Sequence, residues 1–149
     1  MKSFVSTPAL SSCSLNHKVS EDNPPKFLST DEVRRIHRRV APLVPAACDV
    51  ERLESAVRAV ESYACYGEPD DLFDIATSYA FYISEAQQVF LDGHKRTALA
   101  ACLDFVRING VPTEHYDDWD LFDWMMELAT KRIDRVGFAE RLRSPFREQ

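Results

Sequence analysis

The sequence predicts an all-α fold, a bundle of about six helices around a central buried helix. Apolar residues recur every three or four positions in successive stretches from residue 27 onward, which is the period of one helix face. All four glycines fall in breaks between these stretches, and no proline lies between residues 69 and 112. No segment alternates apolar and polar residues as a half-buried strand would, so no sheet is expected.

Two regions differ in composition. Residues 1–26 are rich in serine, contain Pro8, Pro24 and Pro25, and show no periodicity, so we expect a flexible tail. Residues 27–149 are expected to form one helical domain, because a chain of 149 residues is the size of a single domain with one buried core.

The first three helices carry start signals. Ser29 followed by Glu32 fits a capping box. A second helix is expected from about Asp49 and a third from Asp70 and Asp71, because carboxylates favour a helix N-terminus. Glycines and prolines provide the expected stops for the first, second and fourth helices: Pro42, Pro45, Gly67, Pro69, Gly110 and Pro112.

The fourth expected helix, over residues 97–109 with a start at about His94, is apolar on most sides. A helix of this kind belongs at the centre of a bundle, so we expect it to be the central one. A fifth helix is expected over 118–132 and a short sixth over 138–142.

Composition restricts the class of protein. A net charge of −6 argues against direct nucleic-acid binding, which depends on lysine and arginine neutralising phosphates. No apolar run approaches the roughly 20 residues that cross a bilayer, and no secretory signal core is found near the N-terminus. The four cysteines are scattered without a C-x-x-C pair, as is usual for free thiols. We therefore expect a cytoplasmic protein with no membrane partner.

The stretch D-G-H-K-R at 92–96 resembles an anion site. Gly93 precedes an expected helix start, where the backbone N–H groups of residues 93 to 96 should lack intrahelical partners. These groups and the helix dipole attract anions, and Lys95 and Arg96 add two positive charges. Asp92 beside them suits a Mg²⁺ ion that bridges phosphates. The alternative is an ordinary turn with solvated charges, and the P-loop pattern is absent.

The same stretch resembles the signature of the Doc (death-on-curing) toxins of the Fic fold, H-x-F-x-D-G-N-K-R. This chain has Q-V-F-L-D-G-H-K-R at 88–96. The likeness extends to the flanking segments DDLFDIATSYAFYI and TALAACLDFVRINGV, and further to ERLESAVRAVESYACYG and FLSTDEVRRIH, so that it covers about 110 residues, from Phe27 to about Arg141.

The resemblance implies transfer of a phosphoryl or nucleotidyl group from ATP or another nucleoside triphosphate to a protein hydroxyl. Fic relatives mostly transfer AMP, and for this chain phosphoryl transfer is the favoured version. Doc toxins are kinases of elongation factor Tu that a small antitoxin holds in check. By position, Phe90 would anchor the loop and Asp92 would bind Mg²⁺. Gly93 and His94 would form the phosphate cradle, and Lys95 and Arg96 would hold phosphate oxygens. Leu99 stands where AMP-transferring relatives usually carry a second arginine, which favours the Doc branch.

Two residues depart from the signature. Gln88 replaces the histidine that acts as general base, and an amide cannot accept a proton near neutral pH, so assistance of roughly 10²–10⁴ in rate should be missing. Gln88 could still orient a hydroxyl, and phosphoryl transfer depends heavily on positioning. His94 replaces an asparagine. It is a candidate substitute base, although at a helix start its side chain is expected to face the phosphates.

The segment R-R-I-H-R-R at 34–39 is interpreted as a solvated helix face, with an acidic partner such as an antitoxin tail as the alternative. His37 within it has no evident metal companions and is taken as a surface or packing residue.

The leading hypothesis is thus a Doc-like toxin of a toxin–antitoxin pair, a kinase impaired at Gln88. The alternatives are a catalytically inactive Fic-fold interaction protein, to which the changes at Gln88 and His94 also point, and a bacterial effector with a serine-rich export tail.

Overall fold

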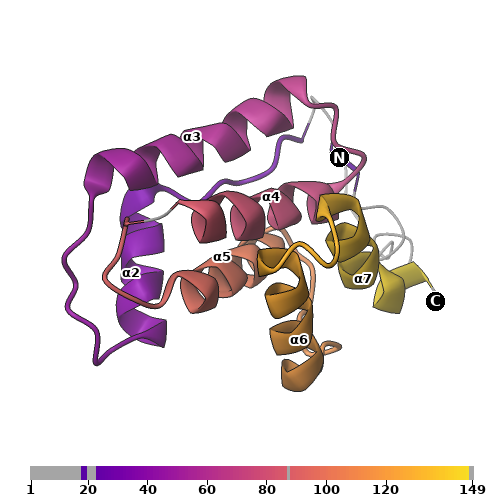
Figure 1. Ribbon diagram of the computed structural model, residues 1–149. Helices are drawn as coiled ribbons and strands as arrows, with labels where there is room; N and C mark the ends of the chain where they lie inside the picture. Colours follow the sequence, from indigo (N-terminus) through magenta and orange to yellow (C-terminus); the bar gives the residue numbers. More distant parts are fainter. Residues whose placement is uncertain (1–17, 20–22, 87, 148–149) are drawn as a thin grey trace.

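The computed structural model describes residues 18–19, 23–86 and 88–147. Within these ranges the chain is all-α, as predicted (Figure 1), and its helices are α2 (Thr30–Val40), α3 (Val50–Tyr66), α4 (Leu72–Glu85), α5 (His94–Ile108), α6 (Asp118–Ala129) and α7 (Arg135–Arg147). The described residues form no strand beyond one isolated antiparallel bridge, which pairs Cys48 with Phe90. None of the described helices has the length and apolar character needed to span a bilayer.

Side-chain caps fix the starts of the first three helices. The predicted capping box is present: the Glu32 amide donates to Ser29 Oγ at 3.1 Å, and the Ser29 amide donates to Glu32 Oε1 at 2.8 Å. Asp49 caps α3 and Asp71 caps α4, each by accepting backbone N–H groups of the first turn. The sequence therefore located these helix starts correctly.

The centre of the bundle is formed by α4 together with α5, which lie side by side in Figure 1. Nine of the fourteen residues of α4 are buried, whereas six of the fifteen residues of α5 are buried. The helix of residues 97–109 is central, as predicted, and α4 shares the centre with it. α4 also buries the polar residues Thr77 and Ser78 beside its apolar stripe, and Ser78 satisfies its hydroxyl by donating to the Ile75 carbonyl.

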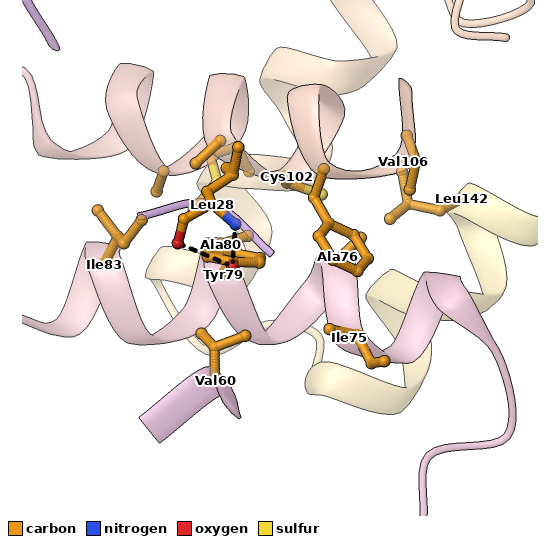
Figure 2. Packing of buried hydrophobic residues seen from close by; sticks show 14 of the residues in the cluster. Leu28, Val60, Ile75, Ala76, Tyr79, Ala80, Ile83, Cys102, Val106 and Leu142 are labelled. Atoms are coloured by element: carbon orange, nitrogen blue, oxygen red, sulfur yellow. Dashed lines mark hydrogen bonds between the residues drawn. The ribbon is translucent and has the colours of Figure 1, made fainter. Parts of the chain in front are cut away.

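The core between these helices is closely packed. Figure 2 shows buried side chains of α4 and α5 together with one residue each from α3, α7 and the segment before α2: Ile75, Ala76, Tyr79, Ala80, Ile83, Cys102, Val106, Val60, Leu142 and Leu28. Alanines at the α4–α5 contact let the two backbones approach closely, since their side chains end at Cβ.

The segment before α2 is attached to this core by hydrogen bonds. The Leu28 amide donates to the Tyr79 hydroxyl at 2.8 Å, and Lys26 exchanges hydrogen bonds with the Asn109 side chain through its own backbone N–H and C=O. Most of the predicted tail, 1–17 and 20–22, lies outside the described residues, and so does Cys13. Cys48, Cys65 and Cys102 are free thiols.

The last two helices differ in length from the prediction. The fifth ends at Ala129, because Lys131 adopts a left-handed φ of 65° that a helix cannot continue through. The sixth, α7, continues to Arg147 although it contains Pro145. A proline leaves the carbonyl four residues before it without its helical donor, and here the Ser144 hydroxyl donates to that carbonyl, of Arg141, at 2.9 Å.

Candidate functional site

The loop that joins α4 to α5 carries the predicted motif and passes beside α2 (Figure 1). Phe90 is buried, as its expected anchoring role requires, while Gln88 and Asp92 are exposed. The loop is fixed to the start of α3 by the Asp49 amide, which donates to the Val89 carbonyl at 2.8 Å. The apolar anchor and this backbone contact hold the loop at a defined place against the bundle.

Gly93 forms the junction between the loop and α5. Its φ of 88° is left-handed, a conformation that glycine adopts without the steric penalty of a Cβ. A Cβ at this position would lie 3.0 Å from Ala41 Cβ and 3.4 Å from His37 Nε2, both on or beside the end of α2. The position therefore needs glycine for its backbone conformation and for its close approach to α2.

The helix start differs in one detail from the prediction. The Gly93 amide is not unpaired, because it donates to Asp92 Oδ1 at 2.7 Å, so the carboxylate of the preceding residue turns back onto it. The amides of residues 94–96 have no hydrogen-bond acceptor among the described residues, and α5 has no side-chain cap. The positive end of the α5 dipole is thus presented by three backbone N–H groups instead of the four expected.

His37 is a residue of this site that the sequence did not single out. It is 1% exposed, and its ring lies flat against Phe90 with centroids 3.9 Å apart and planes at 4°. Its Nε2 lies 2.8 Å from the Asp92 carbonyl oxygen. The sequence contained a signal for the burial of His37, because Val33, Ile36 and His37 have the spacing of one buried helix face.

Three of the four arginines in the arginine-rich segment follow the prediction of a solvated face, whereas Arg34 is half-buried. Arg35, Arg38 and Arg39 are exposed, and Arg39 pairs with Asp104 at 3.2 Å. The segment therefore has a solvated outer face, and His37 lies on the inner one.

His94 makes a hydrogen bond back to the loop that precedes it. Its Nε2 accepts a hydrogen bond from the Phe90 amide at 3.2 Å, so that in the neutral ring the proton is on Nδ1. Because the Nε2 lone pair is engaged within the loop, His94 in this arrangement does not offer it to a substrate hydroxyl. Burial lowers the pKa of His94, with His37 and Lys95 lowering it further and Asp92 opposing them.

This lowered pKa predicts a loss of stability in mild acid. The unfolded chain binds a proton at His94 more tightly than the folded chain does. The contribution of the neutral His94 ring to the free energy of unfolding is therefore fully present above the ordinary pKa of about 6.5, and it is lost as pH falls through the lower pKa of the folded state. We expect the free energy of unfolding, measured by urea titration at pH 7.5 and pH 5, to fall more for the wild type than for His94→Asn. Equal losses would contradict this assignment, because the other histidines are common to both proteins.

The two cations lie at the mouth of the helix start. Lys95 and Arg96 are both exposed, and Arg96 Nη1 donates to the Val40 carbonyl, the last residue of α2, at 3.3 Å. This contact ties the Arg96 guanidinium to the end of α2 and keeps it near the loop, while its remaining N–H groups are available for a bidentate contact with an oxyanion.

One cavity brings most of the predicted site residues together. It has a volume of ≈ 290 Å³ and is lined by residues of the motif and by an apolar wall from α5 and α6: Asp92, Gly93, His94, Lys95, Arg96, Leu99, Phe122, Met125 and Met126. Gln88 is not part of it. Gln88 lines a second hollow of ≈ 480 Å³ together with the segment before α3 and its own loop: Ala47, Cys48, Asp49, Val89, Phe90 and Leu91.

Asp92 fits a magnesium ion that is shared with a ligand. The described residues contain no group of three or more histidines, cysteines and carboxylates that could hold a metal ion by themselves. Mg²⁺ is commonly bound through one or two carboxylates plus phosphate oxygens and waters, and the exposed Asp92 carboxylate lies beside the helix amides where phosphates would bind. The donor set therefore suits a metal that arrives with a phosphorylated ligand.

The fold and this loop define a class: an all-α bundle in which a glycine-initiated central helix, two cations and a carboxylate face one cavity. Comparison with known proteins shows the family of the chain. The chain is 33% identical over 100 residues to the protein kinase Doc of Escherichia phage P1, and the match covers 67% of this chain and 77% of the relative. The chain therefore belongs to the Doc family. No family model matches it.

Proposed function

We propose that this protein is a Doc-type protein kinase that transfers a phosphoryl group from ATP to a hydroxyl of a protein. The observation that supports it best is the start of α5, where the unpartnered amides of residues 94–96, the cations of Lys95 and Arg96 and the carboxylate of Asp92 face one cavity. The similarity to a protein kinase of phage P1 supports the same reaction class.

In this proposal the charges of the loop select and orient the triphosphate. The α5 amides and Lys95 contact phosphate oxygens, and Arg96 contributes a planar, always-charged donor set. Asp92 holds a Mg²⁺ ion, which when bound neutralises charge on the phosphates. Phosphoryl transfer relies mainly on positioning and charge stabilisation, so these residues could support a reduced rate without a general base.

The acceptor hydroxyl is assigned to the side of Gln88. The Gln88 side chain lies in the ≈ 480 Å³ hollow next to the loop, where it can hydrogen-bond a hydroxyl but cannot remove its proton near neutral pH. The proposed substrate is a protein such as a translation factor, for which elongation factor Tu is the leading candidate, and the proposed regulator is a small antitoxin. Transfer of a nucleotidyl group is the less favoured version of the reaction, because Leu99 offers no second arginine. A cytoplasmic location is part of the same proposal.

Removal of the two site cations tests the proposal. We expect the double variant Lys95→Ala, Arg96→Ala to bind ATP–Mg²⁺ at least about tenfold more weakly than the wild type in titration calorimetry, because each charge-assisted phosphate contact contributes about 1.5–3 kcal/mol. The matched control is Arg35→Ala, Arg38→Ala, which removes the same charge from exposed positions of α2. Equal affinities for the two double variants, or no binding by the wild type, would overturn the kinase proposal.

A second candidate is a catalytically inactive interaction protein that keeps the Doc fold. It is favoured by Gln88 together with His94, whose Nε2 is engaged by the Phe90 amide, so that neither replaced position supplies a free base. The intact masses of acceptor proteins separate the two candidates. A gain of one phosphate after incubation with ATP supports the kinase, a gain of one nucleotide supports the nucleotidyl version, and no gain supports the interaction protein.

A further inference from the structure

We propose that His37 is a positioning residue for the anion-binding loop, acting through the peptide that joins Asp92 to Gly93. This inference rests on the proposed function, in that the loop is taken to bind the phosphates of a nucleotide. His37 itself lines neither of the two cavities described above.

The first step is the tautomer of His37. Its Nε2 lies 2.8 Å from the carbonyl oxygen of Asp92. A carbonyl oxygen can only accept a hydrogen bond, so Nε2 carries the proton and donates. The ring is held for this task by the parallel stack on Phe90, with planes at 4°, and by burial that leaves it 1% exposed.

The second step is the orientation of the peptide plane. In a trans peptide the C=O and the N–H of the same plane point in opposite directions. Because His37 draws the Asp92 carbonyl toward α2, the Gly93 N–H must point away from His37, where it meets Asp92 Oδ1 at 2.7 Å. The hydrogen bond from His37 therefore fixes the direction of the Gly93 amide and, through it, the placement of the Asp92 carboxylate.

The third step is the need for such an anchor. Glycine adopts negative and positive φ values with similar ease, so the plane between residues 92 and 93 could turn over at little cost in a free loop. Here φ of Gly93 is 88°, and the Gly93 carbonyl accepts the first helical bond of α5 from the Thr97 amide at 2.9 Å. A turned plane would point a carbonyl toward the bound anion, so His37 excludes the arrangement that would repel phosphate.

The end of α2 supports the loop at a second point. The Val40 carbonyl accepts from Arg96 Nη1 at 3.3 Å, one helical turn beyond His37. One helix therefore holds both the backbone before α5 and a cation of its first turn.

Two substitutions at His37 test its hydrogen-bond donor and its aromatic ring separately. His37→Phe keeps an aromatic ring for the stack on Phe90 but cannot donate, whereas His37→Gln places an amide donor at nearly the same reach without the ring. We expect His37→Phe to bind ATP–Mg²⁺ about tenfold more weakly than the wild type, and His37→Gln to stay within about threefold, as the loss or retention of one hydrogen bond implies. We expect the opposite order in thermal stability, because Phe suits the buried stack better than an amide. Arg38→Ala, an exposed change on the same helix, serves as the control.

The outcome that overturns the proposal is an order of affinities that follows thermal stability, or equal affinities for the two variants. If the wild type binds no ATP, the kinase proposal falls, and the role of His37 is decided by the amide resonance of Gly93. That resonance should move or double in His37→Phe and stay in place in His37→Gln; unchanged resonances in both would overturn it. If neither variant folds, side-chain nitrogen NMR of the wild type decides, since a His37 Nε2 without a proton contradicts the proposal.

Discussion

Replacing Gln88 with histidine is expected to raise the rate of phosphoryl transfer by about 10²–10⁴, the range that a positioned general base contributes. Gln88 lies in the hollow assigned to the acceptor hydroxyl, and its exposed position leaves room for an imidazole. The backbone also suits the change: Gln88 has a φ of 67°, and histidine is found at left-handed φ more often than most residues other than glycine. The new side chain should therefore be accepted without rearranging the loop.

The measurement is the initial rate of labelled phosphate transfer from ATP to the acceptor protein in a lysate or in purified form. Gln88→Asn serves as the control, since it shares the tolerance for left-handed φ but supplies no base near neutral pH. A rate for Gln88→His that equals the Gln88→Asn rate would show that the missing base is not what limits the protein. Labelling by the histidine variant alone would show that the remainder of the site is intact.

Replacing Gly93 with alanine is expected to lower the free energy of unfolding by about 2–3 kcal/mol and to abolish ATP–Mg²⁺ binding. The left-handed φ of 88° is strained for alanine, and its Cβ would lie only 3.0 Å from Ala41 Cβ. The loop would have to move away from α2, which would break the contact between His37 and the Asp92 carbonyl.

Gly110→Ala is a matched control for that change. Gly110 has a similar φ of 91°, but a Cβ there would meet nothing within 4 Å, so its cost should be the backbone strain alone, about 1–2 kcal/mol. Urea titration gives the two stabilities and calorimetry gives the two affinities. A Gly93→Ala protein that is as stable as Gly110→Ala and still binds ATP would refute the close approach to α2 as a requirement of the site.

Much of the fold was predictable because local chemistry fixes it. Ser29 with Glu32, and the carboxylates of Asp49 and Asp71, specify helix starts through bonds to residues two or three positions away. The end of α7 was not predictable in this way. The residue that usually stops a helix, Pro145, is accommodated in the last turns because the adjacent hydroxyl of Ser144 satisfies the Arg141 carbonyl.

The site was predictable in its charges but not in its geometry. The sequence placed Asp92, Lys95 and Arg96 at a helix start, and the structure finds them around one cavity. It could not show that the Asp92 carboxylate folds back onto the Gly93 amide, because that depends on the left-handed turn. Nor did it reveal His37, whose partner lies 55 positions away in the chain and is a backbone atom, which no side-chain pattern records.

The hydrogen bonds between Lys26 and Asn109 have a practical consequence for labelling this protein. Asn109 caps the C-terminal end of α5, and a helix of fifteen residues is about 22 Å long. Lys26 is therefore held at the end of α5 that lies opposite Gly93. A fluorophore or affinity handle attached just ahead of Lys26 would therefore lie near the C-terminal end of α5. Surface immobilisation through such a handle should leave the cavity at the start of α5 open to added ligand.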